Sequence, residues 1–416
     1  MINKLKSRAY DFLRWSQKYT GTDNVYLAKG GFWLTLGQIL SSAASFLSTI
    51  AFANLVDPIT YGNYKYIISI IGTIGIFSLN GMGIAISQAV ARGFENSFYS
   101  GFKTKLKWSC LGSFAAIMGA IYYWAKGNEI LPLPLVMIAV FLPLMQSSSI
   151  YSSFLTGRKI FNIQVKYTTI NNVFATAVMI TAIFVTKNLF WLIAIYLISH
   201  TSLNLLFYLI TKKRFRPNKR EDIETIPYGK HLSLMGIIAN FALYIDKILL
   251  FTFIGSTQVA VYSFAIAVPE QIKSVLKNIN TLALPKFSTK SQEKIKENVG
   301  KKIRKLFLFT GLVFLAYLVF APYLYKIFFP QYLESITYSL WYSLTIITVP
   351  VYFFTTIFSA KMKKAELYKI QIAPPIVKIL LLIVLTPIYG IWGVVVGQMV
   401  ASVFTLALAI FLFKRS

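Results

Sequence analysis

Seven charged side chains lie inside long apolar stretches of the sequence, where a charge needs a function or a partner. Glu270, Lys273 and Lys277 have the spacing i, i+3, i+7, which places them on one face of a helix, and Asn280 continues that face. Buried lysines can bind an anion, and buried carboxylates can carry a proton or a sodium ion. The seven residues are Lys65, Asp246, Lys247, Glu270, Lys273, Lys277 and Lys378.

Each of these charges costs a few kcal/mol in lipid, so we expect it to face the interior of a helical bundle. Two lysines have a simpler alternative. Lys277 and Lys65 lie close enough to the ends of apolar stretches for their ammonium groups to extend toward the lipid headgroups. Lys378 follows Pro374 and Pro375 about nine residues into its stretch, so this alternative does not suit it.

The two carboxylates also have structural alternatives. Asp246 can form an ion pair with a neighbouring lysine, although Lys247 points to another side of the same helix and is not the expected partner. Glu270 can pair with Lys273 or Lys277 instead of carrying a proton. Coupling to H⁺ or Na⁺ through Asp246 and Glu270 is therefore a hypothesis that rests on their depth.

The composition excludes a soluble enzyme. Of the 416 residues, 56% are apolar and 13% are charged, whereas a soluble globular protein has about 25% charged residues. The net charge of +28 indicates basic segments on one side of a membrane rather than nucleic-acid binding. Cys110 has no second cysteine to pair with, and His200 and His231 are too few for a His-rich metal site.

These charged groups must be positioned by apolar helices, since a helix needs about 20 apolar residues to cross a bilayer. The sequence predicts an all-α integral membrane protein with twelve transmembrane helices in two six-helix lobes around a central cationic cavity. The spans are predicted at 31–55, 62–90, 108–125, 131–155, 167–186, 189–211, 232–254, 258–285, 306–324, 336–359, 370–387 and 389–413.

The segments between these spans are alternately basic and nearly uncharged. Basic segments and the two termini hold 34 of the 42 Lys and Arg residues, whereas the other side holds Lys126, Lys187 and Lys326. The positive-inside rule then places both termini in the cytoplasm. The spans themselves keep five lysines against two carboxylates, which favours an anionic substrate.

The chain divides at its most basic internal segment. Residues 212–231 are predicted to be a cytoplasmic linker between an N-terminal lobe, 31–211, and a C-terminal lobe, 232–416. The equal spacing of spans in the two halves is typical of a duplicated transporter fold. Residues 1–30 combine Lys and Arg with apolar residues at helical spacing, which predicts an amphipathic leader on the cytoplasmic membrane surface.

Four stretches resemble the polysaccharide exporters of the multidrug/oligosaccharidyl-lipid/polysaccharide superfamily, in particular bacterial O-antigen flippases of the Wzx type. Asp57-Pro replaces the commoner Gly-Pro of this family, and Ala260 stands where a glycine is frequent. The stretches occur in the expected order along nearly the whole chain. They are Ala53–Tyr64, Leu79–Ala85, Asp246–Leu250 with Gly255, Val259 and Tyr262, and Tyr389–Gly393 with Gly397.

The resemblance implies a flippase, not an enzyme. Its expected cargo is an undecaprenyl-pyrophosphate-linked oligosaccharide, which moves from the cytoplasmic to the outer leaflet of the bacterial inner membrane by alternating access. No cofactor and no nucleic acid are expected, and contact with a polysaccharide polymerase and glycosyltransferases is a further hypothesis. The residues predicted to meet the cargo are Lys65, Lys247, Lys273, Lys277, Lys378 and Asn280.

Other functions remain open at this point. The same site would suit another lipid-linked glycan, such as a capsule, teichoic-type or peptidoglycan precursor. A multidrug exporter is a weaker alternative, because cationic drugs require acidic cavity residues. A membrane-embedded polysaccharide polymerase is weaker still, since the longest outer segment, Ala321–Ser335, carries only one Lys and one Glu.

Overall fold

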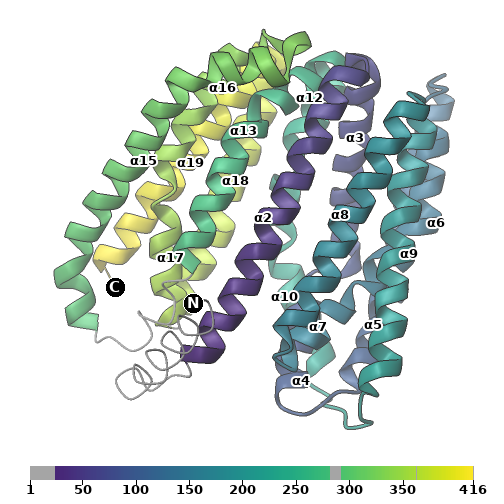
Figure 1. Cartoon of the computed structure of the whole chain (residues 1–416), viewed down its shortest axis with the longest axis vertical. Helices are drawn as coiled ribbons and strands as arrows, with labels where there is room; N and C mark the ends of the chain where they lie inside the picture. The colour runs from purple at the N-terminus through teal and green to yellow at the C-terminus, as the bar shows by residue number, and fades with distance from the viewer. Residues whose placement is uncertain (1–23, 282–291, 362, 416) are drawn as a thin grey trace, which may run out of the picture.

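The computed structural model describes residues 24–281, 292–361 and 363–415, and every regular element in these ranges is a helix (Figure 1). Most of the predicted leader, residues 1–23, lies outside them. The first half of the chain contains α2 (Asn24–Leu55), α3 (Pro58–Ile74), η1 (Gly75–Ser78), α4 (Met82–Ala91), α5 (Ser97–Ala125), α6 (Pro132–Ser148), α7 (Ile150–Gly157), α8 (Phe161–Val185) and α9 (Leu189–Phe215).

The second half begins with three short helices and continues with long ones. Its elements are α10 (Thr225–Met235), α11 (Ile237–Ala242), α12 (Ile245–Phe253), α13 (Ser256–Thr281), α15 (Gln292–Phe328), η2 (Pro330–Tyr332), α16 (Ser335–Tyr342), η3 (Ser343–Thr348), α17 (Val351–Ala360), α18 (Lys364–Tyr389) and α19 (Ile391–Arg415).

The predicted spans correspond to these helices, but two of the twelve are not among the helices that are long and apolar enough to cross a membrane. Within the described residues, nine helices are long and apolar enough to cross a membrane, and the pair formed by Pro58–Ser78 and Met82–Ala91, bent by 49°, makes ten. The spans predicted at 108–125 and 232–254 coincide with α5 and with the α10–α12 series. Helix α5 ends in Tyr and Trp residues, and the α10–α12 series is broken into three short pieces.

Two lobes pack against each other through aromatic side chains and one glycine. Helix α3 contacts α12 and α13 across the boundary. The Tyr66 ring stacks on Phe251 with centroids 3.7 Å apart, and the Tyr61 ring stacks on Phe264 at 4.5 Å. A Cβ atom at Gly62 would stand 1.8 Å from the Ser256 carbonyl oxygen, so only glycine permits this approach of the two backbones.

The start of α3 explains the departure from Gly-Pro. Asp57 is the N-cap residue, and its carboxylate accepts a hydrogen bond from the Thr60 backbone N–H at 2.9 Å. Pro58 follows at the first helical position, where its missing N–H costs nothing. The Asp57-Pro58 pair therefore begins the helix that carries the interlobe contact.

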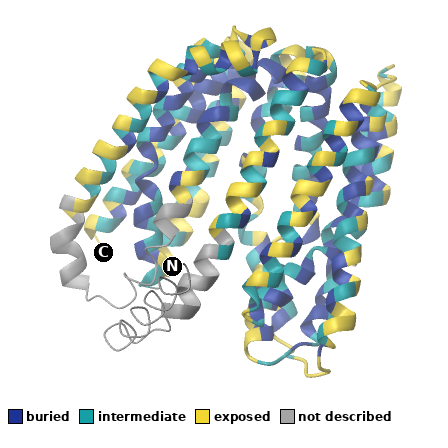
Figure 2. Cartoon of the chain, viewed as in Figure 1, coloured by how far each residue is buried: buried dark blue, intermediate teal, exposed yellow. Residues whose placement is uncertain are grey.

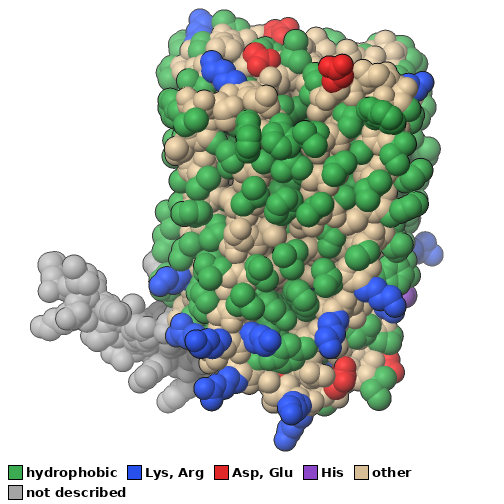
Figure 3. All heavy atoms as spheres, turned by 90° about the vertical axis from the view of Figure 1, so that its right-hand side faces the viewer, with side chains coloured by type: hydrophobic (Ala, Val, Ile, Leu, Met, Phe, Trp, Pro, Cys, Tyr) green, Lys and Arg blue, Asp and Glu red, His purple; other side chains and the backbone are tan. Residues whose placement is uncertain are grey.

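The lateral surface is apolar, as expected for a protein surrounded by lipid. Exposed side chains include Phe184 at 72%, Leu312 at 65% and Ile388 at 66%. Figure 2 shows exposed residues along the outer sides of the helices, and Figure 3 shows a hydrophobic belt between two charged ends. The lower end, which we call the basic end, carries the segments after α4, α7 and α9 (Figure 1).

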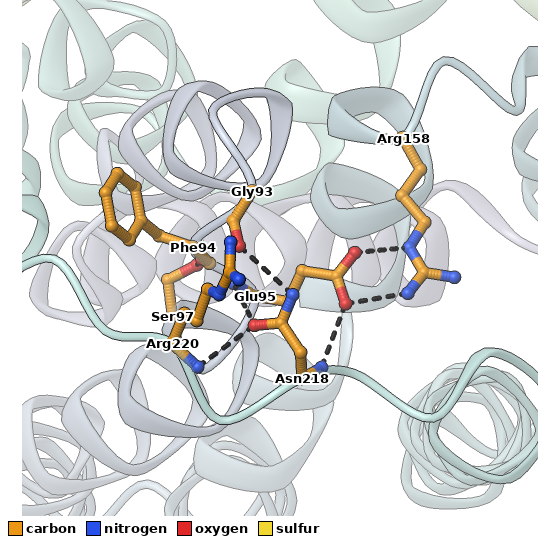
Figure 4. Close-up of polar contacts among 7 residues, drawn as sticks. All are labelled: Gly93, Phe94, Glu95, Ser97, Arg158, Asn218 and Arg220. Carbon is orange, nitrogen blue, oxygen red and sulfur yellow. Dashed lines mark hydrogen bonds and ion pairs between the residues drawn. The ribbon is translucent and has the colours of Figure 1, made fainter.

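At the basic end, the linker after α9 is fastened to the N-terminal lobe (Figure 4). Arg158 donates two hydrogen bonds to the Glu95 carboxylate at 2.6 and 2.7 Å, and the Asn218 backbone N–H donates a third at 2.9 Å. Arg92 pairs with Asp222 at 2.5 Å. Helix α10 contains the predicted boundary between the linker and the second lobe, at residues 231 and 232. This helix packs on α4 and α5 of the N-terminal lobe.

Candidate functional site

A cavity of about 510 Å³, lined by polar and apolar side chains in similar measure, lies between the two lobes, and we call it the central cavity. Helices α2, α3, α8 and α9 line it from one side, and α12 and α13 line it from the other. Its polar lining includes Ser48, Thr49, Asn172, Thr176, His200 and Gln271.

A second cavity of about 510 Å³ continues the central cavity toward the basic end. The two share the lining residues Ser45, Asn172 and Gln271. The remaining lining side chains come from nearer the start of α2 and α8 and the end of α13, and are mainly Gln, Ser and Thr. The polar space therefore runs from the middle of the molecule toward its basic end.

Two lysines and one glutamate give the central cavity its charge. Lys65 on α3 and Lys247 on α12 line it from opposite lobes, and Glu270 on α13 completes the set. The Lys65 ammonium lies 5.3 Å from the centre of the Tyr61 ring, and the Glu270 side chain is 45% exposed. The lining is therefore cationic by one charge and accessible to a ligand.

Asp246 is buried beside this cavity among several donors. Its carboxylate accepts hydrogen bonds from the Tyr262 hydroxyl at 2.8 Å and from the Gln398 amide at 3.2 Å. The expectation that Lys247 points away is wrong, because its Nζ lies 3.4 Å from Asp246 Oδ1. Adjacent helical residues are about 100° apart, but the four-carbon side chain of lysine is long enough to bend back.

Lys273 and Lys277 point into the C-terminal lobe rather than into the central cavity. Lys273 donates to Glu270 at 2.6 Å, and its ammonium lies 5.1 Å from the centre of the Tyr342 ring on α16. The Lys277 ammonium lies 5.2 Å from the Tyr352 ring on α17. On this helix face, Glu270 therefore lies in the cavity wall, whereas Lys273 and Lys277 contact helices inside the C-terminal lobe.

Lys378 extends this charged group from a third helix. It lies on α18, half-buried, and interacts electrostatically with Asp246, Glu270, Lys247 and Lys273. The structure thus brings together six of the seven charged residues that the sequence singled out: Asp246, Lys247, Glu270, Lys273 and Lys378, with Lys65 beside Lys247 and Glu270 in the cavity lining. The Asn280 side chain lies outside the described residues. In the part of the chain that the structure describes, no three His, Cys, Asp or Glu side chains gather to hold a metal ion.

The part of the chain that lines the central cavity lies within a family match. Residues 27–290, more than half of the chain, match the family described as "Polysaccharide biosynthesis protein", and every residue that lines the cavity falls in this range. The chain belongs to the polysaccharide biosynthesis protein family. No curated protein sequence matches it.

Solved structures show which fold this family member adopts. It is similar to "Lipid II flippase MurJ, inward closed conformation" with a TM-score of 0.69 at 13% identity, over 93% of this chain and 87% of the other. An inward-facing MATE transporter of the MOP superfamily gives 0.62 at 13% identity, over 90% and 95%. A MOP superfamily transporter from Pyrococcus furiosus gives 0.58 at 13% identity, over 93% and 96%.

These likenesses cover nearly the whole chain, so they confirm the predicted all-α, two-lobe, multi-pass membrane fold. The identity of 13% restricts the conclusion to the fold.

An apolar groove adjoins the polar space of this polysaccharide biosynthesis protein. It has a volume of about 430 Å³ and lies between α2 and α13. Ala43, Val268 and Val275 give it an apolar wall, whereas Phe46 and Gln271 also line the central cavity. The groove and the central cavity are therefore adjacent and share these two side chains in their walls.

Sequence reasoning missed Lys105, which it placed in a basic loop ending at Lys107. Helix α5 begins at Ser97, so Lys105 is helical and only 6% exposed. Lys103 and Lys107 are four residues apart on one exposed face, and Lys105 lies about 200° around the helix from Lys103. This spacing can be read from the sequence, and it places Lys105 on a different side of the helix from Lys103 and Lys107.

Proposed function

We propose that this protein is a flippase for an undecaprenyl-pyrophosphate-linked oligosaccharide, the O-antigen repeat unit. It moves this cargo from the cytoplasmic to the outer leaflet of the bacterial inner membrane. The two lobes rock about the central cavity and open it to each side in turn. Both termini are cytoplasmic in this proposal, because they share their side with the basic segments.

One observation carries the proposal: the central cavity lies directly beside an apolar groove between α2 and α13, and the two share Phe46 and Gln271 in their walls. Sugars and pyrophosphate lose their hydrogen bonds to water in hydrocarbon, so they need a polar passage. A polyprenyl tail does not. The cavity fits the head of such a lipid, and the groove lets its tail remain in the bilayer.

The charges support an anionic head. Lys65 and Lys247 are the lysines in the cavity wall, and ammonium groups there act as point charges for a diphosphate. Lys273, Lys277 and Lys378 lie behind Glu270 and Asp246 in the C-terminal lobe. We propose that they hold the cavity carboxylates and become available to the diphosphate as the lobes move.

The membrane potential favours export of this cargo. Moving one elementary charge across 100 mV changes the free energy by about 2.3 kcal/mol, so an anion leaves a negative interior downhill. We propose H⁺ or Na⁺ as the counter-ion and Asp246 or Glu270 as its carrier. Contact with a polysaccharide polymerase and with glycosyltransferases is proposed because the cargo passes between them.

The test is export in cells that assemble a surface polysaccharide. Lys273→Ala and Lys378→Ala each remove an ammonium group, and a charged hydrogen bond contributes about 1.5–3 kcal/mol. We expect each variant to lower the amount of exported lipid-linked glycan about tenfold or more at equal protein level. Lys126 follows the last residue of α5, at the end of the molecule away from the basic end. Lys126→Ala is the matched control and should leave export unchanged.

Normal surface polysaccharide in both the Lys273→Ala and the Lys378→Ala variant would contradict the proposed role of these lysines. Offering a peptidoglycan precursor in the same assay decides between the alternative cargoes. Preferred export of that precursor would replace the O-antigen unit as cargo while leaving the flippase mechanism in place.

A further inference from the structure

Lys105 is a buried cation that the central cavity does not use. It lies eight residues after the first residue of α5 and is 6% exposed, whereas Lys103 and Lys107 on the same helix are exposed. The helix therefore directs one of its three lysines inward, into the N-terminal lobe.

Nothing in the described part of the chain neutralises this charge. The four ion pairs among the described residues do not include Lys105, and its ammonium has no hydrogen-bond partner there. A largely buried ammonium without a counter-charge is unfavourable, because part of its hydration is lost and no ion pair replaces it. Such a group is suited to an anion that arrives from outside the chain.

The ammonium faces a hollow of about 450 Å³, within the range of about 300–1,000 Å³ for small-ligand sites. Amides and hydroxyls form most of its wall, and they can donate to and accept from sugar hydroxyls. Beside Lys105, the wall includes Asn80, Gln146, Ser149, Ser153 and Asn204.

Part of this wall is already fixed by hydrogen bonds. The Asn171 amide donates to Asn204 at 2.6 Å, and its carbonyl oxygen lies 2.9 Å from His200 Nδ1. His200 and Asn172 line both the hollow and the central cavity, so the two spaces are neighbours in the N-terminal lobe. Ordered side chains reduce the entropy that binding must overcome.

The hollow is separate from the path of the lipid tail. It shares no lining residue with the apolar groove between α2 and α13. A head group whose tail lies in that groove therefore reaches the hollow through its sugars. The hollow has one ammonium group and the central cavity has two, so the hollow suits the single charge of a carboxylate and the central cavity suits a diphosphate.

We infer that the hollow around Lys105 is a second binding subsite, which takes an acidic sugar of the cargo through its carboxylate. The subsite rests on the proposed flippase function and refines it. It makes the N-terminal lobe select for acidic glycans, while the central cavity binds the diphosphate.

Binding to the full-length protein in detergent tests this subsite. The probes are a glucuronate-containing tetrasaccharide, its glucose-containing neutral counterpart, and farnesyl diphosphate. The wild type should bind the acidic tetrasaccharide about tenfold or more tightly than the neutral one, as expected for one charged hydrogen bond. Lys105→Met should abolish this preference and leave the affinity for farnesyl diphosphate unchanged, whereas Lys107→Met should retain both.

Equal binding of the two tetrasaccharides by the wild type, or an undiminished preference in Lys105→Met, would overturn the subsite. So would a parallel loss of farnesyl diphosphate binding in Lys105→Met. Failure of the wild type to bind farnesyl diphosphate would count against the proposed function and not against the subsite. The comparison of the two tetrasaccharides would still show whether the subsite exists.

Thermal unfolding separates binding from a structural role. Removing an unpartnered buried charge should raise the unfolding temperature of Lys105→Met above that of the wild type. A lower unfolding temperature would mean that Lys105 stabilises the fold, and would overturn the inference.

Discussion

At the scale of single residues, Asp246 is the point where the charged side chains of the C-terminal lobe meet. Tyr262 and Gln398 donate to its carboxylate, and Lys247 pairs with it. Lys378 adds a further positive charge from α18. In the proposed transport cycle, this carboxylate exchanges one of its donors for a counter-ion.

Asp246→Asn tests this role. Asparagine keeps an oxygen for the Tyr262 hydroxyl but removes the charge, which leaves Lys247 and Lys378 without their shared partner. We expect stimulation of transport by an imposed H⁺ or Na⁺ gradient to disappear in proteoliposomes that contain this variant. Glu270→Gln is the comparison, since Glu270 is the other proposed carrier. An unchanged gradient response in Asp246→Asn would reject Asp246 as the carrier.

At the scale of helices, α2 and α13 form the boundary through which a lipid tail would pass. Both helices line the polar cavities on one side and the apolar groove on the other. The two lobes close against each other elsewhere, through α3 with α12 and α13. The groove is therefore an opening beside a tightly packed interface.

A bulky side chain in the groove should slow transport. Ala43→Trp places an indole in the groove, where a tail would otherwise lie, and we expect the transport rate to fall roughly tenfold, about 1.4 kcal/mol of activation free energy. Leu312→Trp, on the lipid-facing side of α15, is the matched control and should leave the rate unchanged. Equal rates for the two variants would remove the groove from the transport path.

The bonds that the Glu95 carboxylate accepts from Arg158 and from Asn218 of the linker make a pH-dependent contribution to the stability of the fold. Burial alone would raise the pKa of Glu95, but the hydrogen bonds from Arg158 and Asn218 and the Arg158 charge hold it below its ordinary value. A carboxyl with a lowered pKa stabilises the fold above its unfolded-state pKa, near 4.3. That contribution disappears as the pH falls through the lowered value.

Glu95→Gln measures this contribution. Above the ordinary glutamate pKa, the variant should be less stable than the wild type by about 1–3 kcal/mol, because Arg158 loses its charged partner. The difference in stability between the variant and the wild type should shrink as the pH falls below the ordinary glutamate pKa. Protonation of Glu95 then removes the same charge from the wild type. Unfolding temperatures across this pH range provide the measurement, and a difference that does not change with pH would contradict the ion pair.

At the scale of the whole molecule, apolar length and the alternation of basic segments were enough to predict the helices and the two-lobe fold. The charged residues were harder to place. Lys247 pairs with Asp246 because its long side chain bends back to the carboxylate, which the helical spacing does not show. Lys105 is buried because α5 begins at Ser97, earlier than the predicted span. The sequence contains no direct signal for which helices of the two lobes face each other, so the apolar groove and the hollow could not be predicted.

The central claim is that the two lobes move the head of a lipid-linked glycan across the membrane. The most direct measurement follows a fluorescent undecaprenyl-pyrophosphate-linked oligosaccharide in proteoliposomes, with a membrane-impermeant quencher outside. We expect the protein to bring the inner-leaflet label to the quencher, and Ala43→Trp to slow this step. Quenching no faster than in protein-free vesicles, under an imposed membrane potential and ion gradient, would contradict the claim.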